Sequence, residues 1–237
     1  MARPLIGITT DHDRDPTRYQ LMHTYVNAVR RAGGEPIALP YHEDADVVRL
    51  LSLVDGLLMT GGNDPDPSTW CEAWHPSCVP VDPRREAFEY RLLDESHARR
   101  TPTLGICLGM QLMGLRGGGA LHQFLPDVPR DGAIEHRKLQ ESDWQRRHAV
   151  QAVAGSRFSE ITGGDELAVN TNHRQALRSA GAGLVVSGHA PDGVIEAIED
   201  PTLPMWVGVQ WHPERLTDDP AQLALFQALV EAAGAAG

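Results

Sequence analysis

The chain has 237 residues, 41% of them hydrophobic, which is enough to build one α/β domain around a full core. Its formal net charge of −11, from 21 basic and 32 acidic residues, argues against a nucleic-acid-binding or anionic-membrane-binding surface. No apolar run approaches the roughly 20 residues that a membrane-spanning helix needs. The N-terminal residues lack the hydrophobic region of a signal peptide, so we expect a cytoplasmic protein.

Short apolar runs alternate with segments of helical spacing in the first half of the chain. Apolar residues such as Leu21, Tyr25 and Ala28 recur at helical intervals and predict a helix over 19–32, which ends at Gly33-Gly34. Continuous apolar strands alternating with helices predict a parallel sheet covered on both faces. The other predicted strands of this half are 4–9, 36–39, 54–59 and 103–106, and the other predicted helices are 47–53, 84–99 and 108–115.

The pattern changes after Leu121. Residues 123–147 look like an irregular excursion, and the strand-like runs that follow lack intervening helices, so part of the sheet, or a second small sheet, should be antiparallel. We find no repeat, linker or second core, and expect a single domain over 1–237. The predicted strands here are 149–153, 167–170, 184–189, 194–198 and 205–210, followed by a helix over 221–233.

The sequence Gly105-Ile106-Cys107-Leu108-Gly109 is the strongest chemical signal. It follows a predicted strand and precedes a predicted helix, as in a turn that presents a nucleophile in strained backbone, where a neighbouring Cβ would clash. The dipoles of a helix N-terminus favour a thiolate. The alternative is a buried cysteine that acts as a small hydrophobe.

A second signal is Trp211-His212-Pro213-Glu214, at the end of a predicted strand. A cysteine nucleophile needs a histidine and a carboxylate as partners, and such triads assemble in space from distant segments. Glu214 could orient the imidazole of His212 and stabilise its charged form. The alternative is a strand-end histidine beside an exposed glutamate.

Two weaker motifs also follow predicted strands. Gly61-Gly62 is a plain turn or one side of an oxyanion hole, whose second donor would be the Leu108 N–H. Residues 170–175 form a capped loop or line a pocket for an amino-acid head group, in which Arg174 could pair with a carboxylate.

Metal and nucleotide signals are weak. The three cysteines, Cys71, Cys78 and Cys107, contain no CxxC pair, so a zinc site or disulfide framework is not expected, although Cys71 and Cys78 could pair in an oxidising compartment. His136 and His148 flank a charged stretch without a metal-ligand pattern, and residues 117–119 lack the lysine of a phosphate loop. We expect no metal or organic cofactor.

Together these motifs resemble the class I glutamine amidotransferase superfamily, and within it the gamma-glutamyl-gamma-aminobutyrate hydrolase-like branch. The resemblance covers nearly the whole chain. It implies a flavodoxin-like, three-layer α/β fold with an open, mostly parallel central sheet, flanking helices and an antiparallel portion. The matching segments are 4–9, 32–36, 39–40, 61–65, 105–111, 118–121, 170–175, 192–197 and 208–214.

The resemblance also implies roles for individual residues in hydrolysis of a gamma-glutamyl amide bond through a thioester. Cys107 would be the nucleophile, His212 the general base and acid, and Glu214 its orienter. Gly62 and Leu108 would supply the oxyanion N–H groups. The implied substrate-binding residues are Gly61, Gln111, Asn172, His173 and Arg174.

Several positions depart from the pattern of that branch. Leu108 stands where arginine is usual, Gly114 replaces asparagine, Glu86 replaces aspartate, and Arg174 replaces histidine. Leu108 and Arg174 border the implied pocket, so the identity of the substrate is left open.

Two other functions compete with the hydrolase. One is a glutaminase subunit that passes ammonia to a separate synthase, and the other is a catalytically silent binding protein on the same scaffold. The expected partner is a small gamma-glutamyl substrate, with no nucleic acid and no membrane. The sequence leaves the oligomeric state open, a homo-oligomer included.

Overall fold

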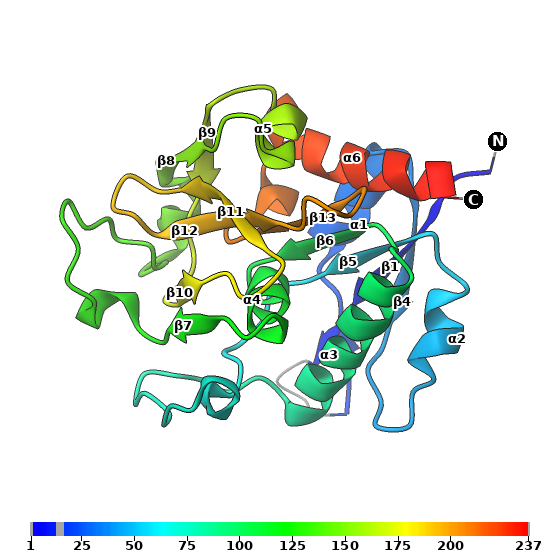
Figure 1. Ribbon diagram of the computed structural model, residues 1–237, viewed down its shortest axis with the longest axis horizontal. Coiled ribbons are helices and arrows are strands. Elements are labelled where there is room, and N and C mark those ends of the chain that lie inside the picture. The colour runs from blue at the N-terminus through cyan, green and yellow to red at the C-terminus, as the bar shows by residue number, and fades with distance from the viewer. Residues whose placement is uncertain (1, 13–16, 237) are drawn as a thin grey trace.

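A sheet of nine strands forms the centre of the computed structural model, which describes residues 2–12 and 17–236 (Figure 1). The sheet is open and mixed. Across it, the strands are β4 (Glu35–Leu39), β1 (Leu5–Thr9), β5 (Gly56–Met59), β6 (Thr103–Ile106), β13 (Trp206–Val209), β12 (Ile195–Glu199), β11 (Val185–His189), β8 (Arg147–Ala152) and β9 (Glu166–Asn170).

The first five strands in this order run parallel, and every pairing beyond β13 is antiparallel. The predicted mostly parallel sheet with an antiparallel portion is therefore confirmed. The inner parallel strands β5, β6 and β13 are buried along their whole length because both of their faces are covered, whereas the edge strand β4 is partly exposed. In β5, for example, Leu58 packs into the core on one face while Leu57 and Met59 pack into the core on the other.

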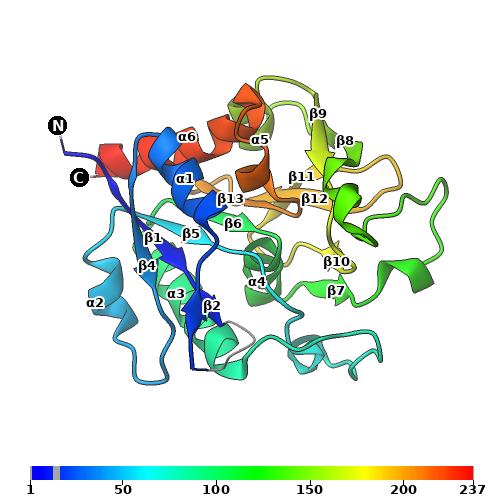
Figure 2. The same ribbon diagram turned by 180° about the vertical axis from the view of Figure 1, so that it is seen from behind.

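Helices cover both faces of the sheet and complete three layers. In Figures 1 and 2 one layer lies above the sheet and the other below it, and their packing contacts agree with this arrangement. One layer holds α1 (His23–Arg31), α5 (Arg157–Thr162) and α6 (Pro220–Ala236), and the other holds α2 (Val47–Leu51), α3 (Pro83–Ala98) and α4 (Leu108–Arg116).

No helix among the described residues combines the length and apolar character needed to cross a membrane.

The predicted helix over 19–32 is wrong at its N-terminal end. Helix α1 begins at His23, whereas β3 (Tyr19–Gln20) pairs antiparallel with β2 (Asp11–His12). A tertiary contact overrides the helical spacing, because the Tyr19 hydroxyl donates to the Tyr41 carbonyl at 2.6 Å and the two rings pack edge to face.

Other short elements were also not predicted. Helix α5 lies between β8 and β9, and β7 (Ala120–His122) pairs with β10 (Ala176–Ser179) in a small antiparallel sheet. The predicted irregular excursion contains two 3₁₀ turns, η2 (Leu125–Asp127) and η3 (Glu141–Gln145).

Glu86 in the first turn of α3 is a buried carboxyl group that lowers stability at neutral pH. Burial raises its pKa from 4.5 to about 7, although it accepts hydrogen bonds from the Asp66 N–H. The unfolded chain ionises Glu86 at a lower pH than the folded protein does. The free energy of unfolding therefore falls as pH rises from 4.5 to about 7, and it stays low at higher pH.

We therefore expect Glu86→Gln to stabilise the protein by about 1–3 kcal/mol at pH 8 and to change it little near pH 4.5. Denaturant melts of both proteins at the two pH values measure this. Exposed Glu43 provides the control Glu43→Gln, for which no such pH-dependent difference is expected. Equal stability of Glu86→Gln and the unsubstituted protein at pH 8 would contradict the prediction.

Candidate active site

Cys107 occupies the turn between β6 and α4 in strained backbone. Its φ of 53° and ψ of −105° lie outside the ordinary regions for a residue with a side chain. The flanking glycines permit this turn: a Cβ on Gly105 would lie 2.8 Å from the Gly109 carbonyl carbon, and one on Gly109 would lie 2.6 Å from Met59 Cβ. Glycine is therefore required at both positions, because a larger side chain would clash with the turn or with β5, as the sequence predicts for a strained turn.

His212 follows β13 and is held in place from two directions. Its main chain forms a paired contact with the Asn170 side chain, in which His212 N donates at 2.9 Å and Asn170 Nδ2 donates to the His212 carbonyl at 2.8 Å. Its Nδ1 lies 2.9 Å from Glu214 Oε1, and both side chains are buried. Glu214 is in η4 (Pro213–Arg215), whose turn brings it back beside the ring.

The environment of His212 favours its charged form. Burial by itself lowers the pKa of the imidazole, but the negative charge of Glu214 and hydrogen bonds with Cys107 and Glu214 raise it to about 10. The ring also meets the edge of Trp144 at 5.7 Å between centroids.

The sheet order brings these groups together. Strands β5, β6 and β13 are neighbours, and all three run parallel, so their C-terminal ends deliver Gly61, Cys107 and His212 to one edge of the sheet. A Cβ on Gly61 would lie 2.9 Å from His212 Cε1 and 3.4 Å from Cys107 Cβ. The glycine loop therefore lies directly beside both the imidazole of His212 and the side chain of Cys107.

Two backbone N–H groups at this edge donate no hydrogen bond to the described residues. They belong to Gly62 and to Leu108, the first residue of α4. The Gly61 N–H, by contrast, donates to the Tyr25 hydroxyl at 3.1 Å. Gly61 was proposed as a substrate-binding residue, and its N–H is already used within the protein.

Buried Arg85 of α3 anchors the glycine loop. Its Nη2 donates to the Gly61 carbonyl and to Thr60 Oγ1, each at 3.0 Å, and its charge is matched by Glu89 at 2.8 Å and Asp11 at 2.9 Å. The loop conformation thus depends on a largely buried ionic network that sequence reasoning did not identify.

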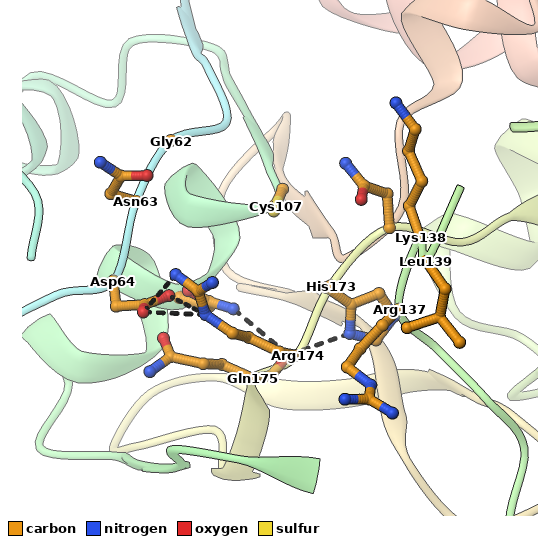
Figure 3. Close-up of a pocket in the computed structure, with 12 residues that line it drawn as sticks. Gly62, Asn63, Asp64, Cys107, Arg137, Lys138, Leu139, His173, Arg174 and Gln175 are labelled. Atoms are coloured by element: carbon orange, nitrogen blue, oxygen red, sulfur yellow. Dashed lines mark hydrogen bonds and ion pairs between the residues drawn. The ribbon is translucent and has the colours of Figure 1, made fainter. Parts of the chain in front are cut away.

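A pocket of about 270 Å³ opens in front of Cys107 (Figure 3). Gln111 extends from α4 and its amide donates to Gln210 Oε1, while Gln210 Nε2 donates to the Cys107 sulfur at 3.6 Å. His212, Glu214 and Gly61 are not among the lining residues. The predicted residues that do line the pocket are Gly62, Cys107, Gln111, Asn172, His173 and Arg174.

The side chains of Arg174 and His173, two of the predicted substrate-binding residues, both contact other residues of the protein. Arg174 forms an ion pair with Asp64 at 2.6 Å, visible as dashed lines in Figure 3. The His173 ring is buried, with Nδ1 2.9 Å from the Gln175 carbonyl and Nε2 3.4 Å from Glu196. Arg174 therefore already has a carboxylate partner, and both ring nitrogens of His173 face other residues of the protein.

The pocket contains more positive than negative charge. Arg137 and Lys138, from the irregular segment, line it with Arg174, against a single lining carboxylate, Asp64. Arg137 is itself paired with Glu135 at 2.7 Å, outside the lining. This excess contrasts with the net charge of −11 of the whole chain. An anionic small molecule would be favoured in such a site.

Cys71 and Cys78 are free thiols, so neither forms a disulfide in this structure. Cys71 is exposed, and Cys78 lies beside Gln175, whose Nε2 is 3.4 Å from the Cys78 sulfur.

Comparison with known proteins agrees with this architecture. The sequence pattern of the Peptidase C26 family matches residues 4–214. The "Putative glutamine amidotransferase Rv2859c" of Mycobacterium tuberculosis is 37% identical over 98% of this chain and 75% of its own length. The gamma-glutamyl-gamma-aminobutyrate hydrolase PuuD of Escherichia coli K12 is 31% identical over 90% of this chain and 87% of its own.

A solved structure shares the fold at low sequence identity. The "putative gmp synthase subunit a protein" of Thermoplasma acidophilum superposes with a TM-score of 0.68 at 18% identity, over 99% of this chain and 96% of its own. The chain belongs to the Peptidase C26 family of class I glutamine amidotransferase-like proteins. The family and these relatives support a hydrolase of the glutamine amidotransferase-like class.

Proposed function

We propose that the protein is a cysteine hydrolase that cleaves the gamma-glutamyl amide bond of a small gamma-glutamyl amine. The observation that carries this proposal is the arrangement of Cys107, His212 and Glu214 at one edge of the sheet, with Glu214 2.9 Å from the imidazole and Cys107 among the groups that raise the pKa of the same ring. Nucleophile, base and orienter in this relation form the pattern of a catalytic triad.

The reaction would proceed as two acyl transfers. The Cys107 thiolate attacks the side-chain carbonyl carbon, and the oxygen that becomes negative accepts hydrogen bonds from the N–H groups of Gly62 and Leu108. The His212 imidazolium gives its proton to the leaving amine, which departs and leaves a gamma-glutamyl thioester. His212 then removes a proton from water, which attacks the thioester and releases glutamate and the thiolate.

The pocket supports a small anionic substrate. Its lining, in which the cationic side chains Arg137, Lys138 and Arg174 outnumber the one carboxylate, Asp64, would favour the α-carboxylate of a gamma-glutamyl group. The amide of Gln111 and the side chain of Asn172 add hydrogen-bonding groups from two separate elements. The amine half of the substrate would meet the segment 137–139, which also lines the pocket.

Removing the charge of Glu214 should lower the catalytic rate and change its dependence on pH. Because Glu214 raises the pKa of His212, we expect Glu214→Gln to lower kcat about 10²–10⁴-fold and to move the alkaline limb of the pH profile to lower pH. Steady-state assays between pH 6 and 10 measure both effects. Exposed Glu231 on α6 gives the matched control Glu231→Gln, and an unchanged profile in Glu214→Gln would contradict the assigned role.

A panel of gamma-glutamyl amides, with glutamine included, tests the proposed function through release of glutamate. We expect turnover of one or more amides larger than glutamine. Ammonia release from glutamine that rises only when a second protein is added would instead favour a glutaminase subunit. No turnover of any member would favour a silent binding protein.

A further inference from the structure

Four buried side chains from separate segments converge beside the pocket without taking part in the proposed reaction. His136 lies in the irregular segment, His148 in β8, His173 in the loop after β9, and Glu196 in β12. One potential metal-ligand atom from each lies within 4.8 Å of all the others. Among the four, Glu196 is 0% exposed, so its carboxylate is wholly removed from solvent.

The facing atoms lack hydrogen bonds. Glu196 Oε1 lies 3.4 Å from His136 Nδ1, 3.4 Å from His173 Nε2 and 3.6 Å from His148 Nε2. None of these nitrogens, and neither oxygen of Glu196, has a hydrogen-bond partner among the described residues. A buried carboxylate and three buried ring nitrogens left in this way are costly unless another group satisfies them.

The other nitrogen of each ring has an acceptor that fixes its proton. His136 Nε2 lies 3.1 Å from Asp192, His148 Nδ1 lies 3.0 Å from the Ala149 carbonyl, and His173 Nδ1 lies 2.9 Å from the Gln175 carbonyl. Carbonyl and carboxylate oxygens accept hydrogen bonds, so these nitrogens are assigned as the N–H groups. The three remaining lone pairs then point toward Glu196.

This is the arrangement of ligands around a metal ion. Metal-binding histidines usually donate their second ring N–H to a carboxylate or a backbone carbonyl, as all three do here. Zinc bonds of about 2.0–2.1 Å at tetrahedral angles place neighbouring ligand atoms about 3.3–3.4 Å apart. The distances of 3.4, 3.4 and 3.6 Å from Glu196 to the three nitrogens are close to that spacing.

We propose that His136, His148, His173 and Glu196 bind a divalent transition-metal ion, and that zinc is the ion they fit best. Three imidazoles and one carboxylate suit zinc, and four protein ligands leave no open position, as in a structural rather than a catalytic site. Asp192 and Glu196 both belong to segment 192–197. This short segment therefore supplies one proposed ligand, Glu196, and also Asp192, which accepts the second ring N–H of the ligand His136. The inference does not depend on the proposed function.

The consequence for the fold is a cross-link between two walls of the pocket. His136 directly precedes Arg137 and Lys138, and His173 lies between Asn172 and Arg174, all of which line the pocket. A bound ion would fasten both segments to β8 and β12. Its role would be to hold the shape of the pocket, which would affect KM more than the chemical step.

Metal analysis of tag-free protein tests the site directly. We expect about one zinc ion per chain after purification, or after dialysis against zinc and gel filtration. His148→Gln and Glu196→Gln should lose this ion, whereas His23→Gln, on the exposed side of α1, should retain it. No bound metal in the unsubstituted protein after zinc dialysis would overturn the proposal.

Two measurements on the unsubstituted protein test the metal site even if the variants fold poorly. Removal of the metal with a chelator should lower Tm by about 5 °C or more, and zinc should restore it. Cobalt(II) in the emptied site should give the intense visible bands of tetrahedral coordination. An unchanged Tm after chelation, or the weak bands of octahedral cobalt alone, would overturn the assignment of a four-ligand site.

Discussion

Replacing Cys107 with alanine should lower kcat/KM for a gamma-glutamyl amide by about 10⁴-fold or more, while the protein stays folded. The thioester cannot form without the sulfur, and the remaining oxyanion donors and pocket contacts would give only weak acceleration of direct attack by water. Side-chain removal at a position 8% exposed leaves a small void, so the change in stability should be modest.

The comparison requires a second thiol as control. Cys71 is exposed and outside the pocket, so Cys71→Ala should keep full activity. Glutamate release measured over a range of substrate concentrations, with Tm recorded for each variant, separates lost chemistry from lost folding. Turnover in folded Cys107→Ala equal to that of the unsubstituted protein would remove this residue from the mechanism.

Replacing Arg85 with methionine should destabilise the protein by about 3–5 kcal/mol, because the buried carboxylate of Glu89 would lose its ionic partner. The double variant Arg85→Met/Glu89→Leu removes both charges and should recover much of that loss. Neighbouring Arg84 is exposed and pairs with Asp82 at the surface, so Arg84→Met should change stability by less than about 1 kcal/mol.

The double variant also tests the glycine loop. It should fold but show a lower kcat, because residue 85 no longer donates to the Gly61 carbonyl and Thr60, beside the proposed oxyanion N–H groups. Urea melts give the free energies and initial rates give kcat. A single variant Arg85→Met as stable as Arg84→Met would contradict the account of this network.

The parallel half of the sheet was predictable because its strands are buried on both faces. Runs such as residues 54–59 and 103–106 are nearly all apolar, and the observed β5 and β6 lie within them. Short elements at the periphery were less predictable. Helix α5 and strands β7 and β10 contain three to six residues each, and tertiary contacts decide such segments more than periodicity does.

The turn motifs of the site were predictable, whereas its supporting network was not. Strained backbone at Cys107 requires glycines at fixed spacing, and the short His212–Glu214 segment closes on itself, so both leave local patterns. Arg85 and Asn170 act through partners 24 and 42 residues away, which leave no local pattern. The histidine cluster was missed for the same reason, because its four members come from four segments.

The most direct measurement is covalent labelling with a chloroketone analogue of glutamine, followed by intact-mass analysis and peptide mapping. We predict one adduct per chain, located on Cys107, with loss of activity in proportion to labelling and protection by a gamma-glutamyl amide. Absence of an adduct on Cys107, or full activity in protein labelled there, would contradict the claim that this sulfur, activated by His212 and Glu214, carries the acyl group.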